Sequence, residues 1–200
     1  AGSWSQELLP QDEINRRISR VEFGDVTETV VSILSELSMQ EGVAWEYLAQ
    51  YMEYLTGETI PSKEAQVKFY RNMHVKEPAA KNVKIAELFG KLAQVSVNLN
   101  ATGKRVLPEY FLHAKGQMIF NSVAGTIGAL ALGVEVAEVE ETKLPYPAMK
   151  AVIEPKTLAS MLEKWFYEYK LLWRVTCRES EIHRVQNVIF WLADFLRDVK

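Results

Sequence analysis

The fold class of this chain is decided by residues 155–199, which read PKTLASMLEKWFYEYKLLWRVTCRESEIHRVQNVIFWLADFLRDV. Large apolar residues recur in this stretch at three- and four-residue spacing, which is the period of an amphipathic α-helix. If the stretch were one continuous helix, the apolar stripe of its second half would lie nearly opposite the stripe of its first half. One straight helix would then have to bury two opposing faces. The sequence therefore predicts two helices, with a break near residues 177–180.

The two apolar stripes are long enough to make this C-terminal hairpin (155–200) the expected stability centre and self-association surface. Pro155 suits the first turn of a helix, and Ser180 and Glu181 suit the cap and first turn of the next one. The first stripe contains Leu158, Met161, Leu162, Trp165, Phe166, Tyr169, Leu172 and Trp173. The second contains Ile182, Val185, Val188, Ile189, Leu192, Leu196 and Val199.

The rest of the chain shows more helical patterns and a little alternation. Helices are predicted over 25–39, with Asp25 and Glu28 at its start, and over 44–55, 62–74, 79–93 and 108–132. The alternation around Asn-Ala-Thr-Gly favours a β-hairpin over 95–107, and the alternative is that this run is the end of a long helix. A Val-rich run predicts a strand over 134–140 that could pair with 149–153. We expect a mainly α fold of six or seven helices with at most a small antiparallel β element. It forms a single domain over residues 1–200, with residues 1–10 flexible.

Composition excludes several classes of protein. The apolar fraction is 48% and the charged fraction 24%, as in ordinary globular domains. One cysteine excludes a disulfide framework and a cysteine-based zinc site, and three scattered histidines leave no metal site to expect. No cofactor motif occurs.

The start of the chain has no signal-peptide pattern, and the apolar segment 118–136 carries polar residues and glycines that favour a buried helix over a membrane span. A cytoplasmic protein is expected.

Charge is unevenly distributed along the chain, although the net charge is only −3. Residues 1–62 have eleven acids and three arginines, whereas residues 63–115 have ten bases and four acids. The favoured interpretation is that the two segments neutralise each other within the fold. Alternatively, the bases share a face that binds nucleic acid or an acidic protein. These bases are Lys63, Lys68, Arg71, Lys76, Lys81, Lys84, Lys91, Lys104, Arg105 and Lys115.

Two groups of residues in the C-terminal hairpin are candidate sites. Trp165, Phe166, Tyr169 and Trp173 could line a ligand pocket, although such stripes more often form a core or a dimer interface. The spacing of Arg178 and His183 at the head of a helix resembles that of the HEPN family of helical ribonucleases. In that family, the histidine moves a proton and the arginine stabilises charge on phosphate. The acids between these two residues would repel an RNA backbone, so we expect no catalytic role for them.

Residues 79–153 carry an ordered series of motifs that extends beyond single sites. The series is Val-Asn-Leu99, Gly103-Lys-Arg-Val-Leu107, Ser-Val-Ala-Gly-Thr-Ile-Gly-Ala-Leu at 122–130, Val136-Ala-Glu-Val and Leu144-Pro145. In this order the segment resembles subunits of the transport protein particle (TRAPP) and the related vinyl-reductase-type ligand-binding domain. The resemblance implies an α+β module that dimerises through helices and works by binding. It covers less than two fifths of the chain, and the C-terminal hairpin is extra to the family pattern.

The residues and the resemblance together favour an interaction protein over an enzyme. We expect a self-associating module that scaffolds a protein partner or holds an apolar ligand, without a cofactor or metal. The alternative is a nucleic-acid-binding helical protein, with or without RNA cleavage, that uses the bases of 63–115.

Overall fold

A computed structural model describes residues 9–40, 76–132, 149–150 and 153–199 of the chain. Within these ranges the structure is built from helices without any strand, so the predicted mainly α fold is confirmed. The helices are α1 (Gln11–Phe23), α2 (Val30–Ser38), α5 (Lys76–Ser96), α6 (Ala101–Leu132), α7 (Pro155–Thr176) and α8 (Glu179–Asp198). The helices predicted over 44–55 and 62–74 and the strand predicted over 134–140 lie outside the described residues. No helix in these ranges combines the length and the apolar character that crossing a bilayer requires.

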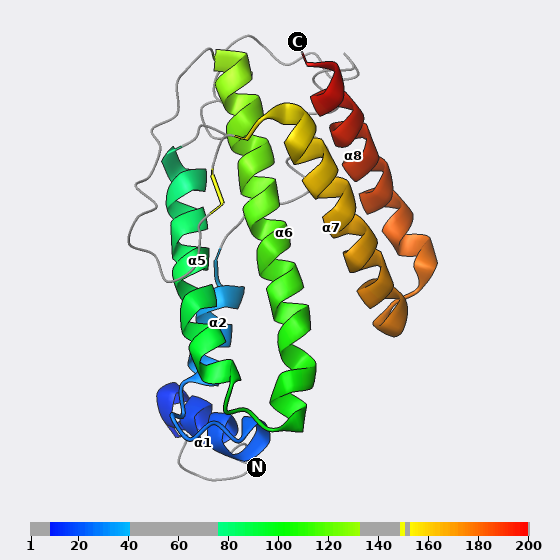
Figure 1. Cartoon of the computed structure of the whole chain (residues 1–200). Coiled ribbons are helices and arrows are strands. Elements are labelled where there is room, and N and C mark those ends of the chain that lie inside the picture. Colours follow the sequence, from blue (N-terminus) through cyan, green and yellow to red (C-terminus); the bar gives the residue numbers. More distant parts are fainter. Residues whose placement is uncertain (1–8, 41–75, 133–148, 151–152, 200) are drawn as a thin grey trace.

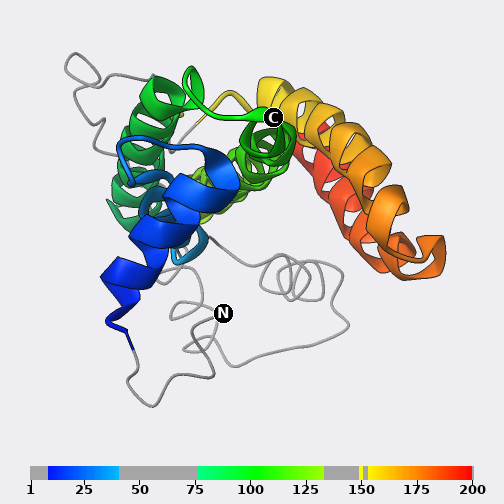
Figure 2. The same ribbon diagram turned by 90° about the horizontal axis from the view of Figure 1, so that it is seen from below.

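Helix α6 is the centre of the architecture. It lies between α5 on one side and the α7–α8 pair on the other (Figure 1), and the view from below shows the same order (Figure 2). One apolar cluster joins α2, α5 and α6 and includes Leu88 and Leu107. A second cluster joins α6, α7 and α8 and includes Ile119 and Leu162. Because α6 supplies residues to both clusters, it forms a wall that the two halves of the core share.

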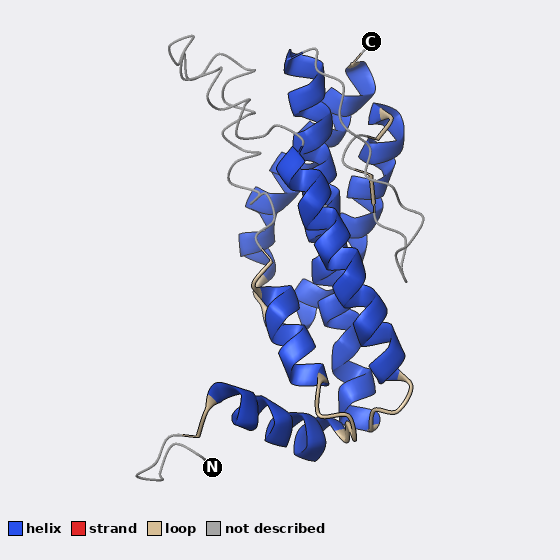
Figure 3. Cartoon of the chain, turned by 90° about the vertical axis from the view of Figure 1, so that its left-hand side faces the viewer, coloured by secondary structure: helices blue, strands red, loops and turns tan. Residues whose placement is uncertain are grey.

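Helix α1 lies across one end of the other helices (Figure 3). Gly24 ends it in the left-handed conformation, with φ +66°, which a residue with a Cβ rarely adopts. Asn100 joins this end of α1 to the start of α6. Its backbone N–H donates to the carbonyl of Phe23 and its side-chain amide donates to that of Glu22, both at 2.9 Å. Its side-chain oxygen accepts from the N–H of Gly103, also at 2.9 Å, so Asn100 caps α6 as well.

The β-hairpin predicted over 95–107 is wrong. Helix α5 continues to Ser96, and α6 already begins at Ala101 and passes through Pro108. The alternation that suggested strands comes from a short loop in which Leu99 is buried whereas Val97 is 73% exposed. The cap at Asn100 starts the helix there, seven residues before the proline that we had expected to open it.

The start of α2 also differs from the prediction. The helix begins at Val30 rather than at residue 25, and Glu28 lies before it with a positive φ of 60°. Asp25 still serves the helix start, because its buried carboxylate accepts from the backbone N–H groups of Thr27 (2.9 Å), Thr29 (2.8 Å) and Val30 (2.8 Å). The carboxylate therefore satisfies amides that the first turn leaves without helical partners.

The predicted C-terminal hairpin is present. Helix α7 begins at Pro155, and the Glu154 side chain caps it by accepting from the N–H groups of residues 156 and 157. The break falls at 177–178, and α8 runs back beside α7 (Figure 1). Ser180, predicted to cap α8, lies inside the helix, and the cap position is Arg178. The ion pair of Arg197 with Glu163 joins the two helices at the other end of the hairpin.

A buried polar cluster fastens the segment before α7 to α5 and α6. Asn82 of α5 donates to the Met149 carbonyl at 2.9 Å, and the Ser122 hydroxyl of α6 donates to the Lys150 carbonyl at 2.6 Å. One turn further along α6, the Thr126 hydroxyl accepts from the Ile153 N–H at 3.2 Å. These hydrogen bonds hold the described part of 149–153 against α5 and α6.

Candidate functional site

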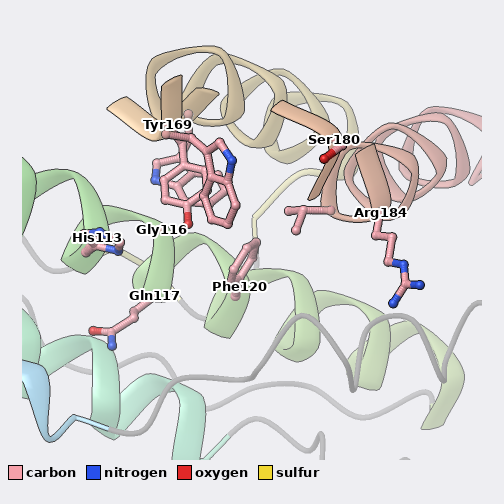
Figure 4. Close-up of a pocket in the computed structure, with 10 residues that line it drawn as sticks. His113, Gly116, Gln117, Phe120, Tyr169, Ser180 and Arg184 are labelled. Atoms are coloured by element: carbon pink, nitrogen blue, oxygen red, sulfur yellow. The ribbon is translucent and has the colours of Figure 1, made fainter. Parts of the chain in front are cut away.

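The described structure has a groove of about 670 Å³ where α6, α7 and α8 meet. Helix α7 contacts α6 at Trp165 and Gly116 and diverges from it towards the turn with α8 (Figure 2), and Trp173 and Ser180 on either side of this turn line the groove. We call it the aromatic groove. Its lining residues are His113, Gly116, Gln117 and Phe120 of α6, Trp165, Tyr169 and Trp173 of α7, and Ser180, Arg184 and Val185 of α8 (Figure 4).

The α7 wall of the aromatic groove is a row of three rings at four-residue spacing. Trp165 and Tyr169 are stacked with their centroids 5.0 Å apart, and Trp173 follows at 5.9 Å from Tyr169 with a tilted ring. Both indoles are fixed by hydrogen bonds, because Trp165 donates to the Leu112 carbonyl and Trp173 to the Arg178 carbonyl, each at 2.9 Å. The wall is therefore held in place before any ligand arrives, which lowers the entropy lost on binding.

The α6 floor is shaped by a glycine. A Cβ at Gly116 would lie 2.5 Å from Cζ2 of Trp165, closer than real side chains approach. Only a residue without a side chain lets the indole lie against the α6 backbone at this point. Phe120 packs edge-on against Trp165 at 5.1 Å, and His113 packs edge-on against Tyr169 at 5.6 Å. The two flanking rings thus extend the aromatic surface onto α6.

Polar groups stand at the two ends of the aromatic groove. In Figure 4, His113 and Gln117 lie at one end and Ser180 and Arg184 at the other. Gln117 also donates to the Gln40 carbonyl at 3.1 Å. Between these ends the environment is apolar: burial raises the pKa of the Tyr169 phenol, and the nearby Cys177 adds to the rise. The ring therefore stays neutral at physiological pH.

The structure brings together three of the four predicted aromatic residues. Trp165, Tyr169 and Trp173 line the groove, whereas Phe166 is fully buried and packs against Phe190 of α8, with the ring centroids 5.9 Å apart. Sequence reasoning missed the α6 and α8 residues of the groove. On α6 a usable signal was present, because residues 113, 116–117 and 120 recur at helical spacing. For α8 no signal in the sequence pointed towards α6.

Arg178 and His183 lie outside the aromatic groove. Arg178 occupies the cap position of α8, where its carbonyl accepts from Trp173, and both side chains are exposed. Cys177, at the end of α7, is exposed. The absence of a catalytic role for Arg178 and His183 stays a prediction.

The ten bases of 63–115, which in the alternative interpretation share a face, are spread over two helices in the described part of the chain. Lys63, Lys68 and Arg71 lie outside the described residues. Lys76, Lys81, Lys84 and Lys91 are on α5, and Lys104, Arg105 and Lys115 are on α6. Two of them form ion pairs with acids from other parts of the chain: Lys84 with Glu36 of α2 at 2.7 Å, and Lys115 with Glu168 of α7 at 3.3 Å. The pair with Glu36 links the basic segment to the acidic N-terminal one, as the favoured interpretation requires.

Metal-ligating residues and similarity to known proteins were the remaining sources of information about function. In the part of the chain that the structure describes, no group of three or more His, Cys, Asp or Glu side chains could hold a metal ion. Comparison of the chain with protein-family models, curated proteins and solved structures finds no match. The resemblance of residues 79–153 to TRAPP subunits therefore rests on the sequence pattern alone.

Proposed function

We propose that this protein is a non-enzymatic binding protein that holds a small ligand with a flat, apolar body in the aromatic groove. The observation that carries the proposal is the prearranged row of Trp165, Tyr169 and Trp173 beside an open volume of about 670 Å³. Small-molecule sites have volumes of roughly 300–1,000 Å³ and combine apolar walls with a few polar groups. Both features are present here.

A flat body suits this site better than a bulky aliphatic one. Rings bind rings by offset stacking or edge-to-face contact, and the groove offers ring faces on α7 and the ring of Phe120 on α6. The indole hydrogen bonds hold Trp165 and Trp173 in position, so these rings need not reorganise when a ligand enters.

The test uses N-phenyl-1-naphthylamine, an uncharged flat probe whose fluorescence rises in apolar surroundings. We expect saturable one-site binding to the full chain. Ser180→Phe, which fills the groove from α8, should weaken this binding by about fivefold or more, equivalent to about 1 kcal/mol. Asn187→Phe is the matched control, because Asn187 is equally exposed on α8 but does not line the groove. Failure of the wild type to bind the probe, or equal binding by both variants, would refute the proposal.

Self-association through the outer face of α7 is a second candidate function. Tyr167, Leu171 and Val175 recur every four residues on this helix and are 58%, 66% and 77% exposed. A row of exposed large apolar residues is typical of contact surfaces. The row favours a second copy of the chain packing against the hairpin.

A further inference from the structure

The aromatic groove has one charged residue in its lining, and that residue is positive. Among the described residues that line it, Arg184 carries a permanent charge and none is acidic. An arginine side chain is protonated at every physiological pH and presents a planar fork of donors that matches a carboxylate, sulfonate or phosphate. The other polar lining groups, at His113, Gln117 and Ser180, are hydrogen-bonding groups rather than fixed negative charges.

Arg184 lies near the N-terminal end of α8. It belongs to the second turn of α8, one turn after Ser180, and the N-terminal end of this helix faces the same end of the groove (Figure 4). The positive end of the helix dipole adds to the field of the guanidinium, whereas Glu179 and Glu181 in the first turn oppose it. The preference for an anion therefore rests on the guanidinium of Arg184 itself.

The charged end and the aromatic wall are rigidly connected. The Trp173 indole donates to the Arg178 carbonyl at 2.9 Å, which ties the last ring of the wall to the residue that opens α8. About one turn before Trp173 on α7, the Lys170 ammonium donates to the Gln186 side chain of α8 at 2.9 Å. A ligand that stacks on the rings therefore has α8, the helix that carries Arg184, at a fixed end of the groove.

We propose that the ligand of the aromatic groove is an amphipathic anion. Its flat apolar body stacks on Tyr169 and Trp173, and its single negative group binds Arg184. This inference rests on the proposed function, because it names the class of ligand for the same groove. It distinguishes aromatic acids and their sulfonate or phosphate counterparts from neutral and cationic aromatic compounds, for which the lining offers no carboxylate.

The experiment compares two probes that share one ring system. 8-Anilinonaphthalene-1-sulfonate carries a sulfonate, and N-phenyl-1-naphthylamine lacks it. Both are titrated by fluorescence into the wild-type chain, Arg184→Gln and Arg178→Gln. We expect Arg184→Gln to weaken binding of the sulfonate by about three- to tenfold, as loss of one charge-assisted contact at a solvent-accessible site should. Binding of the uncharged probe should change by less than about twofold. Arg178→Gln is the matched control, because Arg178 is an exposed arginine at the cap of the same helix but does not line the groove, and it should change neither.

The outcomes separate the inference from the function on which it rests. If both probes bind but Arg184→Gln weakens them equally or not at all, the anion preference is refuted and the groove remains a binding site. If Arg178→Gln acts like Arg184→Gln, a general positive field rather than the groove attracts the sulfonate, which also refutes the inference. If the wild type binds neither probe, the proposed function itself is refuted. Arg184 is exposed, so Arg184→Gln should melt at the wild-type temperature and its binding can be interpreted directly.

Discussion

The indole of Trp165 lies directly against the backbone of α6 at Gly116, where a Cβ would approach Cζ2 of the indole to 2.5 Å. Trp165 is 4% exposed and belongs to the cluster that joins α6, α7 and α8. The absence of a side chain at Gly116 sets how closely α7 approaches α6, and the groove lies next to this contact.

Gly116→Ala should destabilise the protein despite the better helix propensity of alanine. Propensity alone favours alanine by about 1 kcal/mol, but displacing a packed indole costs about 1–3 kcal/mol. In a Trp165→Ala background the clash is absent, so Gly116→Ala should be neutral or stabilising there. Urea unfolding of the four proteins in this cycle measures the coupling. Additive effects of the two substitutions would show that the close contact has no energetic consequence.

Trp165→Ala should lower stability by about 3–5 kcal/mol, because it leaves a large cavity in the apolar cluster of the hairpin. Trp173→Ala should cost less, since this side chain is only half-buried. The neighbouring Lys164→Ala should leave the melting temperature unchanged, because Lys164 is exposed. Thermal melts of the three variants check the ranking. A Trp165→Ala protein that melts with the wild type would exclude the hairpin as the stability centre.

Stability should fall in acid through Asp25. Burial on its own would raise the pKa of this carboxyl group, but hydrogen bonds from the Thr27 hydroxyl and from the N–H groups of residues 30, 27 and 29 lower it below the ordinary value of 3.8. A lowered folded-state pKa means that the carboxylate stabilises the fold above about pH 3.8 and that this contribution is lost as the pH falls further. Asp25→Asn should therefore cost about 1–3 kcal/mol near pH 7.

The difference between wild type and Asp25→Asn should shrink when unfolding is measured near pH 3, because Asp25 of the unfolded chain, with its ordinary pKa of 3.8, then takes up a proton and favours unfolding of the wild type. Asp12→Asn is the control, since Asp12 is an exposed carboxylate at the start of α1. A gap between wild type and Asp25→Asn that stays constant from neutral pH to pH 3 would contradict the assigned role.

Asn82→Ala should destabilise the junction between α5, α6 and the segment before α7. Asn82 is buried, donates to Met149 and accepts from Asn121 at 3.0 Å. Truncation would leave the Met149 carbonyl without this donor, at a cost of about 1–3 kcal/mol. Hydrogen exchange should then speed up at Ile153, whose N–H is held by Thr126 beside this cluster. Asn98→Ala, in an exposed loop position, should change neither quantity.

Self-association through α7 can be tested by charge. Sedimentation velocity of the wild type should show a dimer, and the double variant Leu171→Lys, Val175→Lys should be monomeric with an unchanged melt. Val26→Lys is the matched control, because Val26 is an equally exposed valine (81%) in another part of the chain. A monomeric wild type would eliminate this candidate function and leave the groove proposal untouched.

The sequence predicted those elements whose apolar stripes are strong. The two stripes of the hairpin were offset enough to require the break at 177–178, and the break is there. Helix α1 was not predicted, because its sequence QDEINRRISRVEF has few large apolar residues and its contacts are mostly polar. Among them are a Ser19 hydroxyl that accepts from Val31 and an amide of Asn100 that donates to Glu22. Such long-range polar contacts leave no periodic trace.

The groove could be predicted only on one of its walls. The α7 rings form a visible stripe, but their partners come from α6 and α8, and helical periodicity does not say which face of one helix meets another. Gly116 illustrates the limit. In the sequence it is one small residue in a helix, and only the position of Trp165 some fifty residues later shows why a side chain is excluded there. Arg184 likewise becomes a candidate ligand contact only after α8 is placed beside the rings.

The shared position of α6 has a consequence for sequence change in that helix. Leu107, Ala114 and Met118 serve one apolar cluster, and Ile119 and Val123, among others, serve the second. Each added residue turns a helix by about 100°. Inserting or deleting a single residue between Met118 and Ile119 would therefore rotate one half of α6 against the other by about 100°. Contacts with both neighbours would be disrupted, because Gly116 before this point contacts Trp165 of α7 and Asn121 after it contacts Asn82 of α5. The length of α6 therefore cannot change by one residue without loss of contacts, and sequence changes in its two halves must preserve the same helical register.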